Sequence, residues 1–418
     1  MTQRKILAGL DLGTAKTRAL VLETDGGAVR ALGFGTSVSA GIRKGVIVDI
    51  EQAAEAVRSA VDDAEESAGV RITRVIGGVA SAHVSCAGSY GVVGVADRAV
   101  TALDRQKAID AAGIMYVPVD REILHKVPNE FVLDGRDSIR NPVGMQAVRL
   151  EARILVVTAP AAEVQKFSVV CREAGLTLSR TVFGPLAAAG AVLTERERNE
   201  GAVLVDIGAG TTGIAVFRNG APVHCAAVGV GGAHLTNDLA VGLRVTAAEA
   251  EELKLRHLSL AAQHQAANGT VRLGSNGSGR EVSAADLLSI AGPRCAEMAA
   301  LIRKEIVNAK TADAPLHVVL TGGASLLPGF SELAEKILGL PVRIGSPLMI
   351  QGMRHEARTP VFSAAVGLAL AGKPEKDEAA RETLDNGALS GLRTAGRRLT
   401  GLFRNLNFDK NKKGVRYV

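Results

Sequence analysis

The sequence contains few aromatic residues and few cysteines. Only 3% of its 418 residues are aromatic and none is Trp, while 47% are hydrophobic, so small aliphatic side chains must fill the interior. The four cysteines form no CxxC pair, and the eight histidines show no metal-ligand spacing. This pattern argues against a disulfide framework and a zinc site, and it favours a reducing compartment.

Long apolar runs are also absent, because no stretch reaches the roughly 18 residues of a transmembrane helix. Residues 1–5 lead directly into a short apolar strand, so we expect no secretory signal. The net charge of +6 is concentrated in residues 393–418, which hold eight Lys or Arg residues and one acidic residue. The remaining 41 basic and 42 acidic residues nearly cancel, so we expect no nucleic-acid partner.

Two stretches of the chain, roughly two hundred residues apart, repeat one pattern. In each, an apolar run ends in an aspartate, Asp11 or Asp206, and a glycine-containing turn with threonine and a second apolar run follow. This pattern predicts a strand, a tight glycine turn and a strand, in which backbone N–H groups can point at an anion. A single turn of this kind fits a purely structural hairpin equally well.

The duplicated pattern is stronger evidence for a binding site than a single copy, because it indicates two similar domains around one cleft. A chain of 418 residues has room for two or more domains with substantial cores. An aspartate at the end of each strand can hold a hydrated Mg²⁺ beside phosphates. Two such hairpins facing each other would hold a triphosphate from both sides.

The hydrophobic pattern predicts the secondary structure of the other segments. Helices are expected over 51–67, 104–112, 163–174, 186–193, 234–240, 246–256 and 283–310, the last with a break at Pro293. Strands are expected over 70–80, 124–133, 147–158, 176–182 and 316–320. Residues 83–162 are interpreted as an inserted α+β subdomain, and the Pro-containing, charged residues 373–390 as a flexible linker.

Two further features point to a nucleotide. Gly322 and Gly323 form a third glycine turn after a buried strand, and such a turn permits the backbone to approach a ring or a sugar closely. Glu251 and Lys254 lie one helical turn apart and could reach a ribose and a base or phosphate. In isolation, a solvated intrahelical salt bridge explains this pair equally simply.

The order of these elements resembles the actin/Hsp70/sugar-kinase superfamily and, within it, the FtsA family of bacterial cell-division proteins. The resemblance covers nearly the whole chain and is carried by residues 9–16, 141–144, 205–211, 254–257, 320–324 and 342–347. It implies an α/β fold of two actin-like domains, which is a duplicated ribonuclease H-like architecture. An FtsA-type inserted subdomain and a C-terminal amphipathic helix complete the expected fold.

The resemblance also implies domain boundaries. A first actin-like subdomain takes residues 1–82, 163–193 and 356–372, and the FtsA-type insertion takes 83–162. A second actin-like subdomain takes 194–233 and 315–355, and its companion takes 234–314. The linker at 373–390 and the amphipathic helix at 391–408 follow.

The resemblance further implies the ligands, ATP and Mg²⁺, and the residues around them. Asp11 and Asp206 would face the metal. The residues implied to surround ATP are Gly13, Thr14, Ala15, Lys16, Gly208, Gly210, Thr211, Thr212, Gly232, Glu251, Lys254, Gly322 and Gly323.

The implied role is that of a filament-forming protein at the division site. Proteins of this family tether the tubulin-like protein FtsZ to the cytoplasmic face of the inner membrane, to which they bind peripherally, and they recruit later division proteins. The implied docking face for FtsZ lies within 234–314, near Arg294.

Gly184 is the main departure from the hydrolytic relatives. Hsp70-like proteins carry a glutamate where this chain has Gly184, and that carboxylate helps to position the attacking water. Glycine supplies no such group, so we expect weak or no ATPase activity and identify no catalytic residue. ATP would then act as a structural ligand that closes the cleft.

Residues 391–408 have the pattern of an amphipathic basic helix. At 100° per residue the apolar side chains share one arc, and the basic ones occupy the other side. The apolar set contains Leu392, Leu399, Leu402, Phe403 and Leu406, and the basic set contains Arg393, Arg397, Arg398 and Arg404. This arrangement suits an anionic membrane surface, although a helix docked on the protein itself and a disordered basic tail are alternatives.

Two other functions remain open. A small-molecule kinase of the same superfamily would need a catalytic aspartate in the cleft beyond the metal pair, and the sequence offers no compelling candidate. A pilus-assembly protein of PilM type would share the core of the fold but not the basic terminal helix.

Overall fold

The computed structural model describes residues 4–261, 270–272, 281–309, 315 and 317–373. Almost all of the expected linker at 373–390, and the whole expected amphipathic helix at 391–408, lie outside the described residues, so both stay predictions. Among the helices that are described, none is long and apolar enough to span a membrane.

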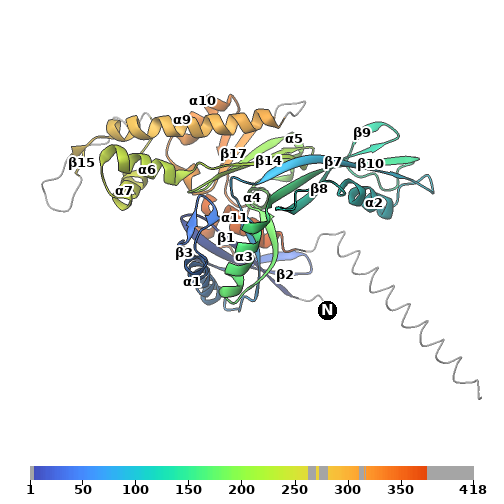
Figure 1. Ribbon diagram of the computed structural model, residues 1–418, viewed down its shortest axis with the longest axis horizontal. Coiled ribbons are helices and arrows are strands. Elements are labelled where there is room, and N and C mark those ends of the chain that lie inside the picture. Colours follow the sequence, from blue (N-terminus) through green and yellow to red (C-terminus); the bar gives the residue numbers. More distant parts are fainter. Residues whose placement is uncertain (1–3, 262–269, 273–280, 310–314, 316, 374–418) are drawn as a thin grey trace, which may run out of the picture. The chain divides into compact units, whose positions relative to one another are not determined.

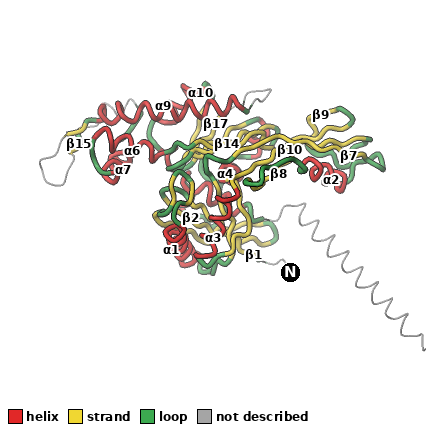
Figure 2. The backbone as a smooth tube through the Cα atoms, viewed as in Figure 1, coloured by secondary structure: helices red, strands yellow, loops and turns green. Residues whose placement is uncertain are grey.

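Two five-stranded sheets have the same topology (Figures 1 and 2). The spatial order of the first is β11 (Thr177–Phe183), β6 (Arg74–Val79), β1 (Lys5–Leu12), β2 (Lys16–Asp25) and β3 (Ala28–Val38). The order of the second is β18 (Val342–Ile344), β17 (His317–Thr321), β12 (Ala202–Ile207), β13 (Thr212–Arg218) and β14 (Ala221–Val228). In each sheet an antiparallel three-strand meander is extended by two parallel strands. The predicted duplication is therefore confirmed, and the repeated hairpins are β1–β2 and β12–β13.

Helices cover both sheets and form two large hydrophobic cores with them. The core of the first sheet includes residues of α1 (Ile50–Ala68), α3 (Ala161–Glu173), α4 (Gly184–Val192) and α11 (Ser363–Leu370). The core of the second includes residues of α6 (Gly232–Leu243), α7 (Ala247–His257), α9 (Ala284–Asn308) and α10 (Phe330–Leu338). The short elements are β4 (Ile42–Arg43), β5 (Val46–Ile47), α5 (Glu195–Glu200), β15 (Val271–Arg272), β16 (Glu281–Val282), η1 (Gly323–Leu326), η2 (His355–Arg358) and η3 (Pro360–Phe362).

Small residues allow the elements of the first half to pack closely. A Cβ atom on Gly367 of α11 would stand closer than 3.0 Å to the carbonyl oxygen of Ala187 in α4. A Cβ atom on Gly9 of β1 would meet the carbonyl oxygen of Ala365 in the same way. Backbones in such close contact leave no space for large side chains, which fits the scarcity of aromatic residues.

The long helix predicted over 283–310 is confirmed as α9, but the predicted break at Pro293 is wrong. Proline removes one helical hydrogen bond, which would run to the carbonyl of Ser289. Pro293 and Ser289 are both exposed, so water can bind that carbonyl. Buried side chains before and after the proline, including Leu287 and Cys295, hold the helix on the core.

The predicted insertion forms a separate sheet with its own hydrophobic core. Its spatial order is β7 (Ser85–Gly94), β10 (Arg149–Pro160), β8 (Arg121–Leu133) and β9 (Arg136–Ile139), and α2 (Ala102–Ala112) packs on β7 and β10. Arg121 joins the strand ends, since its guanidinium donates to Thr158 Oγ1 and to the carbonyl oxygens of His83 and Thr158. Figure 1 places this sheet beside β14 of the second half.

Candidate functional site

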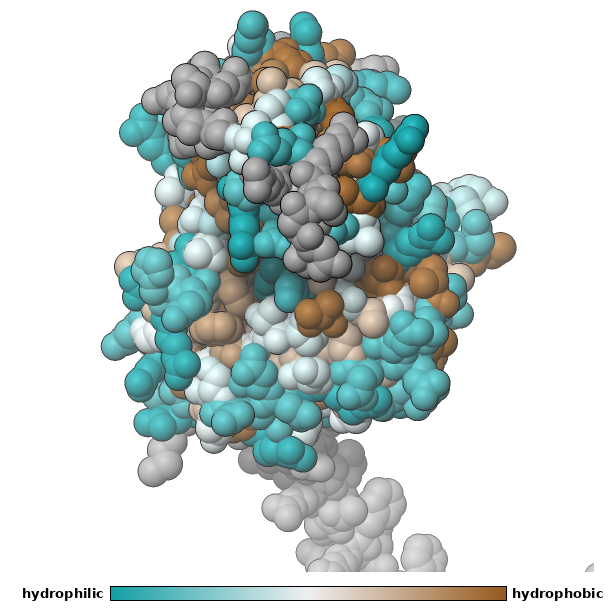
Figure 3. Space-filling model, turned by 90° about the vertical axis from the view of Figure 1, so that its left-hand side faces the viewer, coloured by the Kyte–Doolittle hydropathy of each residue, from teal (hydrophilic) through white to brown (hydrophobic). Residues whose placement is uncertain are grey.

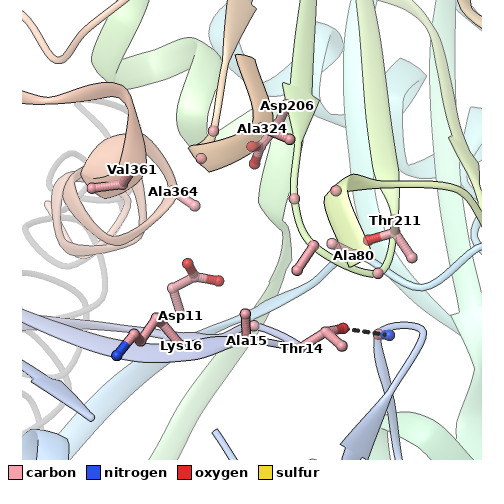
Figure 4. A pocket seen from close by; sticks show the side chains of 18 of the residues that line it. Asp11, Thr14, Ala15, Lys16, Ala80, Asp206, Thr211, Ala324, Val361 and Ala364 are labelled. Atoms are coloured by element: carbon pink, nitrogen blue, oxygen red, sulfur yellow. Dashed lines mark hydrogen bonds between the residues drawn. The ribbon is translucent and has the colours of Figure 1, made fainter. Parts of the chain in front are cut away.

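The two repeated hairpins meet at their glycine turns. A Cβ atom on Gly210 would stand 2.9 Å from Lys44 Cα and closer still to Thr14 Oγ1. The Thr14 hydroxyl accepts a hydrogen bond of 2.9 Å from the Gly45 N–H, drawn as a dashed line in Figure 4. The turn after β12, the turn after β1 and the loop between β4 and β5 are therefore in mutual contact.

A cavity of about 530 Å³ opens between these turns. All of the residues implied to surround ATP and Mg²⁺ line it, with the exception of Thr212. The Thr212 side chain is buried instead, and its hydroxyl donates to the Val230 carbonyl over 2.8 Å. Figure 3 views one face of the molecule and shows hydrophobic side chains at the waist between its upper and lower parts, where hydrophilic ones are fewer.

The carboxylates of Asp11 and Asp206 approach the cavity from opposite sides (Figure 4). Burial and, to a lesser extent, the neighbouring Asp11 raise the pKa of Asp206 to about 7, against the opposing effect of Arg18. Burial also raises the pKa of Asp11, again against the effect of Arg18. Two carboxylates with raised pKa values around one cavity are typical of a functional site rather than of a structural ion pair.

Arg18 is a lining residue that the sequence analysis missed. It lies opposite Asp11 in the register of β1 and β2. Burial lowers its pKa, although Asp11 and Asp206 act in the opposite direction. The signal was present, because residues placed symmetrically about a hairpin turn share one face of the sheet.

The predicted pair on α7 forms a salt bridge and also lines the cavity. Lys254 Nζ lies 2.6 Å from Glu251 Oε2 and 2.9 Å from the hydroxyl of Thr236 in α6. It also donates to the Gly232 carbonyl over 3.2 Å at the start of α6. The intrahelical salt bridge therefore exists, and both partners remain part of the cavity wall.

Gly322 closes the wall beside Asp206. Its φ of 82° lies in the region that favours glycine, and a Cβ atom there would stand 2.6 Å from the Ile207 carbonyl oxygen and closer still to Asp206 Oδ1. A larger residue would therefore displace the aspartate. The paired glycines were predicted to let a ring or a sugar approach the backbone, and that prediction is separate from this contact with Asp206.

Two carboxylates in one cavity fit a hydrated Mg²⁺, because this hard cation prefers oxygen ligands and keeps several waters. Within the described ranges, neither Asp11 nor Asp206 forms an ion pair within 4.0 Å, so their oxygens are available to a cation and its waters. No group of three or more His, Cys, Asp or Glu residues that could hold a metal occurs there either. The site therefore suits a cation shared with a bound anion rather than a closed protein cage.

Glu163 is a second lining residue that the sequence analysis missed. One of its carboxylate oxygens lies 2.7 Å from His83 Nδ1, and the other is buried without a hydrogen-bond partner. Gly184 does not line the cavity, but a Cβ atom there would stand 3.6 Å from the Cβ of Ala80, which does. A Cβ atom therefore fits at this position, next to a residue of the cavity wall.

Arg294, the expected partner contact, lies away from the cavity on α9. Its guanidinium binds Asp238 of α6 with an Nε–Oδ2 distance of 2.7 Å and also pairs with Glu297. The side chain is 27% exposed. Arg294 therefore links two helices as well as reaching the surface.

Comparison with known structures shows the fold. A chain of the PilM–PilN type IV pilus biogenesis complex matches with a TM-score of 0.63 and 17% identity, covering 88% of this chain and 98% of that chain. The structure of MreB5 of Spiroplasma citri bound to ADP matches with a TM-score of 0.51 and 14% identity, covering 91% and 99%. At these identities the likeness establishes an actin-like fold and no more.

Comparison with known sequences goes further. The family model for cell division protein FtsA matches residues 203–367, and the model for the SHS2 domain inserted in FtsA matches residues 81–158. The FtsA protein of Pseudomonas aeruginosa is 38% identical, over 90% of this chain and 91% of that protein. The FtsA protein of Escherichia coli K12 is 32% identical, over 89% and 91%. Since identity at this level extends over the insertion and both halves of the fold, the chain belongs to the FtsA family of cell-division proteins.

Proposed function

We propose that this protein is an ATP-binding, actin-like division protein that forms filaments on the cytoplasmic face of the membrane, tethers FtsZ there and recruits later division proteins. The observation that carries the nucleotide part is the meeting of two glycine hairpins, each preceded by an aspartate, around one cavity. An ADP-bound relative of the same fold supports the same assignment.

Different groups of lining residues suit different parts of the ligand: the phosphates, the cation and the adenosine. The turns around Gly13 and Gly210 present backbone N–H groups, which suit the phosphates. Asp11 and Asp206 would hold a hydrated Mg²⁺, which supplies positive charge against the phosphate oxygens when it is bound. Glu251, Lys254 and the turn at Gly322-Gly323 would surround the adenosine.

The substitution Asp206→Asn tests this assignment. It removes one of the two carboxylates but keeps the shape of the side chain, so we expect the affinity for ATP with Mg²⁺ to fall about tenfold or more, or 1.4 kcal/mol. Without nucleotide, the same variant should be as stable as the wild type or more stable, because a buried charge beside Asp11 is removed. The control is Asp62→Asn on the exposed face of α1.

Calorimetry with ATP and Mg²⁺, together with thermal unfolding of the free protein, measures both effects. Unchanged affinity in Asp206→Asn would contradict the assignment. A loss of affinity that came with a large loss of stability would indicate a damaged fold rather than a lost ligand contact.

The proposed docking of FtsZ within 234–314 rests on the family resemblance, and Arg294 is the residue expected to take part. Arg294→Glu should abolish co-sedimentation with FtsZ filaments, but it would also break the ion pair with Asp238. Asp238→Ala is the matched control, since it breaks the same ion pair and leaves the arginine in place. Loss of binding in Arg294→Glu alone supports a direct contact, whereas equal loss in both variants would place the cause in helix packing.

The proposed membrane attachment rests on residues 391–408. Each basic residue near an anionic surface contributes about 1 kcal/mol, and the apolar side chains add a comparable amount, so one tail binds weakly. Filaments would present many tails to one membrane and so strengthen the binding. Leu402→Glu combined with Phe403→Glu should release the full-length protein from liposomes and leave ATP affinity unchanged. Full sedimentation of this variant under non-polymerising conditions would show that the anchor lies elsewhere.

Replacing Arg393, Arg397, Arg398 and Arg404 by Gln should weaken binding mainly to anionic vesicles, because the apolar arc is retained. The effect should be smaller at high salt, where screening already removes the attraction. An equal loss of binding to neutral and anionic vesicles would contradict the electrostatic part of the proposal.

A further inference from the structure

Arg18 brings a positive charge to the same place as the two carboxylates. Its side chain lines the cavity from β2, directly opposite Asp11 in the strand register, and it interacts electrostatically with both Asp11 and Asp206. Across the described part of the chain, its guanidinium has no hydrogen bond and no ion pair within 4.0 Å. The N–H groups of a guanidinium are therefore present at the wall of an anion-binding cavity without protein acceptors.

An aromatic contact stabilises the position of this guanidinium. Its central carbon lies 5.5 Å from the centroid of the Phe362 ring, within the range of a cation–π interaction. Phe362 is itself buried and packs edge-on against Phe34 with a centroid distance of 4.9 Å. Arg18 is thus held before any ligand arrives, which lowers the entropic cost of a contact with an anion.

A positive charge on Arg18 is important for anion binding because the other charges at the cavity are mainly negative. With both carboxylates ionised, Asp11 and Asp206 repel a triphosphate, and a divalent cation normally offsets this repulsion. The two lysines of the cavity wall offset less of this negative charge. Lys254 is already paired with Glu251, and Lys16 is exposed to solvent. Arg18 supplies a permanent positive charge and a planar fork that matches phosphate oxygens.

We propose that Arg18 takes over part of the role of the divalent cation, so that this protein binds ATP with only a weak dependence on Mg²⁺. The inference rests on the proposed nucleotide site and specifies how its charge is balanced. The guanidinium offsets the carboxylate pair when no metal is present and contacts the phosphates when nucleotide enters. It also competes with a cation for the two carboxylates in the free protein.

The test measures the affinity of the full-length protein for ATP with excess Mg²⁺ and with excess chelator. For the wild type, removal of Mg²⁺ should weaken binding by less than about tenfold. For Arg18→Gln it should weaken binding by about 100-fold or more, because nothing then offsets the carboxylates. Lys5→Gln, which neutralises an exposed lysine at the start of the neighbouring strand β1 and outside the cavity lining, is the matched control and should behave like the wild type.

A second measurement uses Mn²⁺ as a spectroscopic probe for the divalent site, without nucleotide. Arg18→Gln should bind Mn²⁺ about tenfold more tightly than the wild type, since the guanidinium no longer competes for Asp11 and Asp206. Arg18→Lys keeps the positive charge, so its affinity for Mn²⁺ should stay close to that of the wild type. If Arg18→Gln does not fold, this variant still separates the effect of charge from that of packing. Thermal unfolding verifies that each variant is folded.

Three results would overturn the inference. They are a loss of about 100-fold or more when Mg²⁺ is removed from the wild type, an equal Mg²⁺ dependence in Arg18→Gln, and unchanged Mn²⁺ binding in that variant. Absence of ATP binding to the wild type under both conditions is a different failure, because it would refute the nucleotide site itself.

Discussion

Gly210 is the residue at which the contact between the two hairpins can be tested most directly. In Gly210→Ala, the new Cβ atom would clash with Thr14 Oγ1 and would stand 2.9 Å from Lys44 Cα. Because Lys44 Cα is a backbone atom, this clash can be removed only if the loop between β4 and β5 shifts. Relief at Thr14 requires its hydroxyl to rotate away, which removes the hydrogen bond from the Gly45 N–H.

These two changes set the expected magnitude. A partly buried N–H left without an acceptor costs about 1–3 kcal/mol, and the displaced loop lines the cavity. We expect the free energy of unfolding to fall by about this amount and the ATP affinity to fall about tenfold or more. Gly210→Val, with a larger side chain, should block ATP binding.

A control and a rescue make the prediction specific. Gly190→Ala in α4 adds the same methyl group where nothing lies within 4 Å, so it should leave ATP affinity unchanged and raise stability by about 0.5–1 kcal/mol. Thr14→Ala removes the clashing hydroxyl, so Gly210→Ala should cost at least about 1 kcal/mol less in that background. Denaturant unfolding and calorimetry of the four proteins of the cycle measure this coupling.

Additive effects in the cycle would refute the steric argument. If Gly210→Ala bound ATP as tightly as the wild type, the proposed nucleotide site would also be refuted at this turn. The turn after β12 would then not approach the ligand.

Gly184→Glu should accelerate ATP hydrolysis by about 10²–10⁴-fold over a slow wild-type rate, because a Cβ atom fits there beside Ala80 of the cavity wall and a carboxylate on this side chain can orient the water. The rate of phosphate release measures this effect. If the wild type instead hydrolysed ATP at about 1 s⁻¹ and Glu163→Gln abolished this activity, Glu163 would be identified as the carboxylate that orients the water. His125 accepts a hydrogen bond of 2.8 Å from the Phe183 N–H, and burial lowers its pKa to about 4 from 6.5. Its contribution, about 3 kcal/mol, should be present above pH 6.5 and be lost as the pH falls through about 4. His125→Gln, whose amide oxygen can accept the same bond at any pH, should flatten this dependence in thermal unfolding between pH 7.5 and 5; an unchanged profile would place the acid sensitivity elsewhere.

The hairpins could be predicted from the sequence because their signals are local. A strand, a glycine turn and a second strand lie within Lys5–Asp25 in the first copy and Ala202–Arg218 in the second, and the repeat of the pattern indicated the domain duplication. The helix expected over 51–67 is α1, and its start is fixed by a local cap in which Asp49 accepts from the Gln52 N–H. Local hydrogen bonds of this kind are readable from neighbouring residues.

The side-chain positions that the sequence did not predict depend on register and on distant contacts. Thr211 and Thr212 were both assigned to the ligand, but neighbouring side chains at the start of a strand point to opposite faces, and only Thr211 lines the cavity. Any contact from Thr212 must come from its backbone. Glu163 meets His83 from the other end of the insertion, eighty residues away, and no local pattern indicates that contact.

Asp206 carries an energetic cost that its apolar neighbours in β12 do not, because burial disfavours its charged form. Central strands such as β12 are buried along almost their whole length, and Asp206 is the residue in β12 that is only partly buried. A carboxylate with a pKa raised to about 7 is ionised at the expense of folding, and hydrophobic burial elsewhere in the two cores must offset that cost. A ligand that brings positive charge, or a cation held by Asp11 and Asp206, lowers the cost because the carboxylates are then compensated. Binding of such a ligand and the stability of the fold are therefore coupled through electrostatics, and this coupling requires no hydrolysis. A bound ligand of this kind would stabilise the conformation in which Asp11 and Asp206 lie around one cavity.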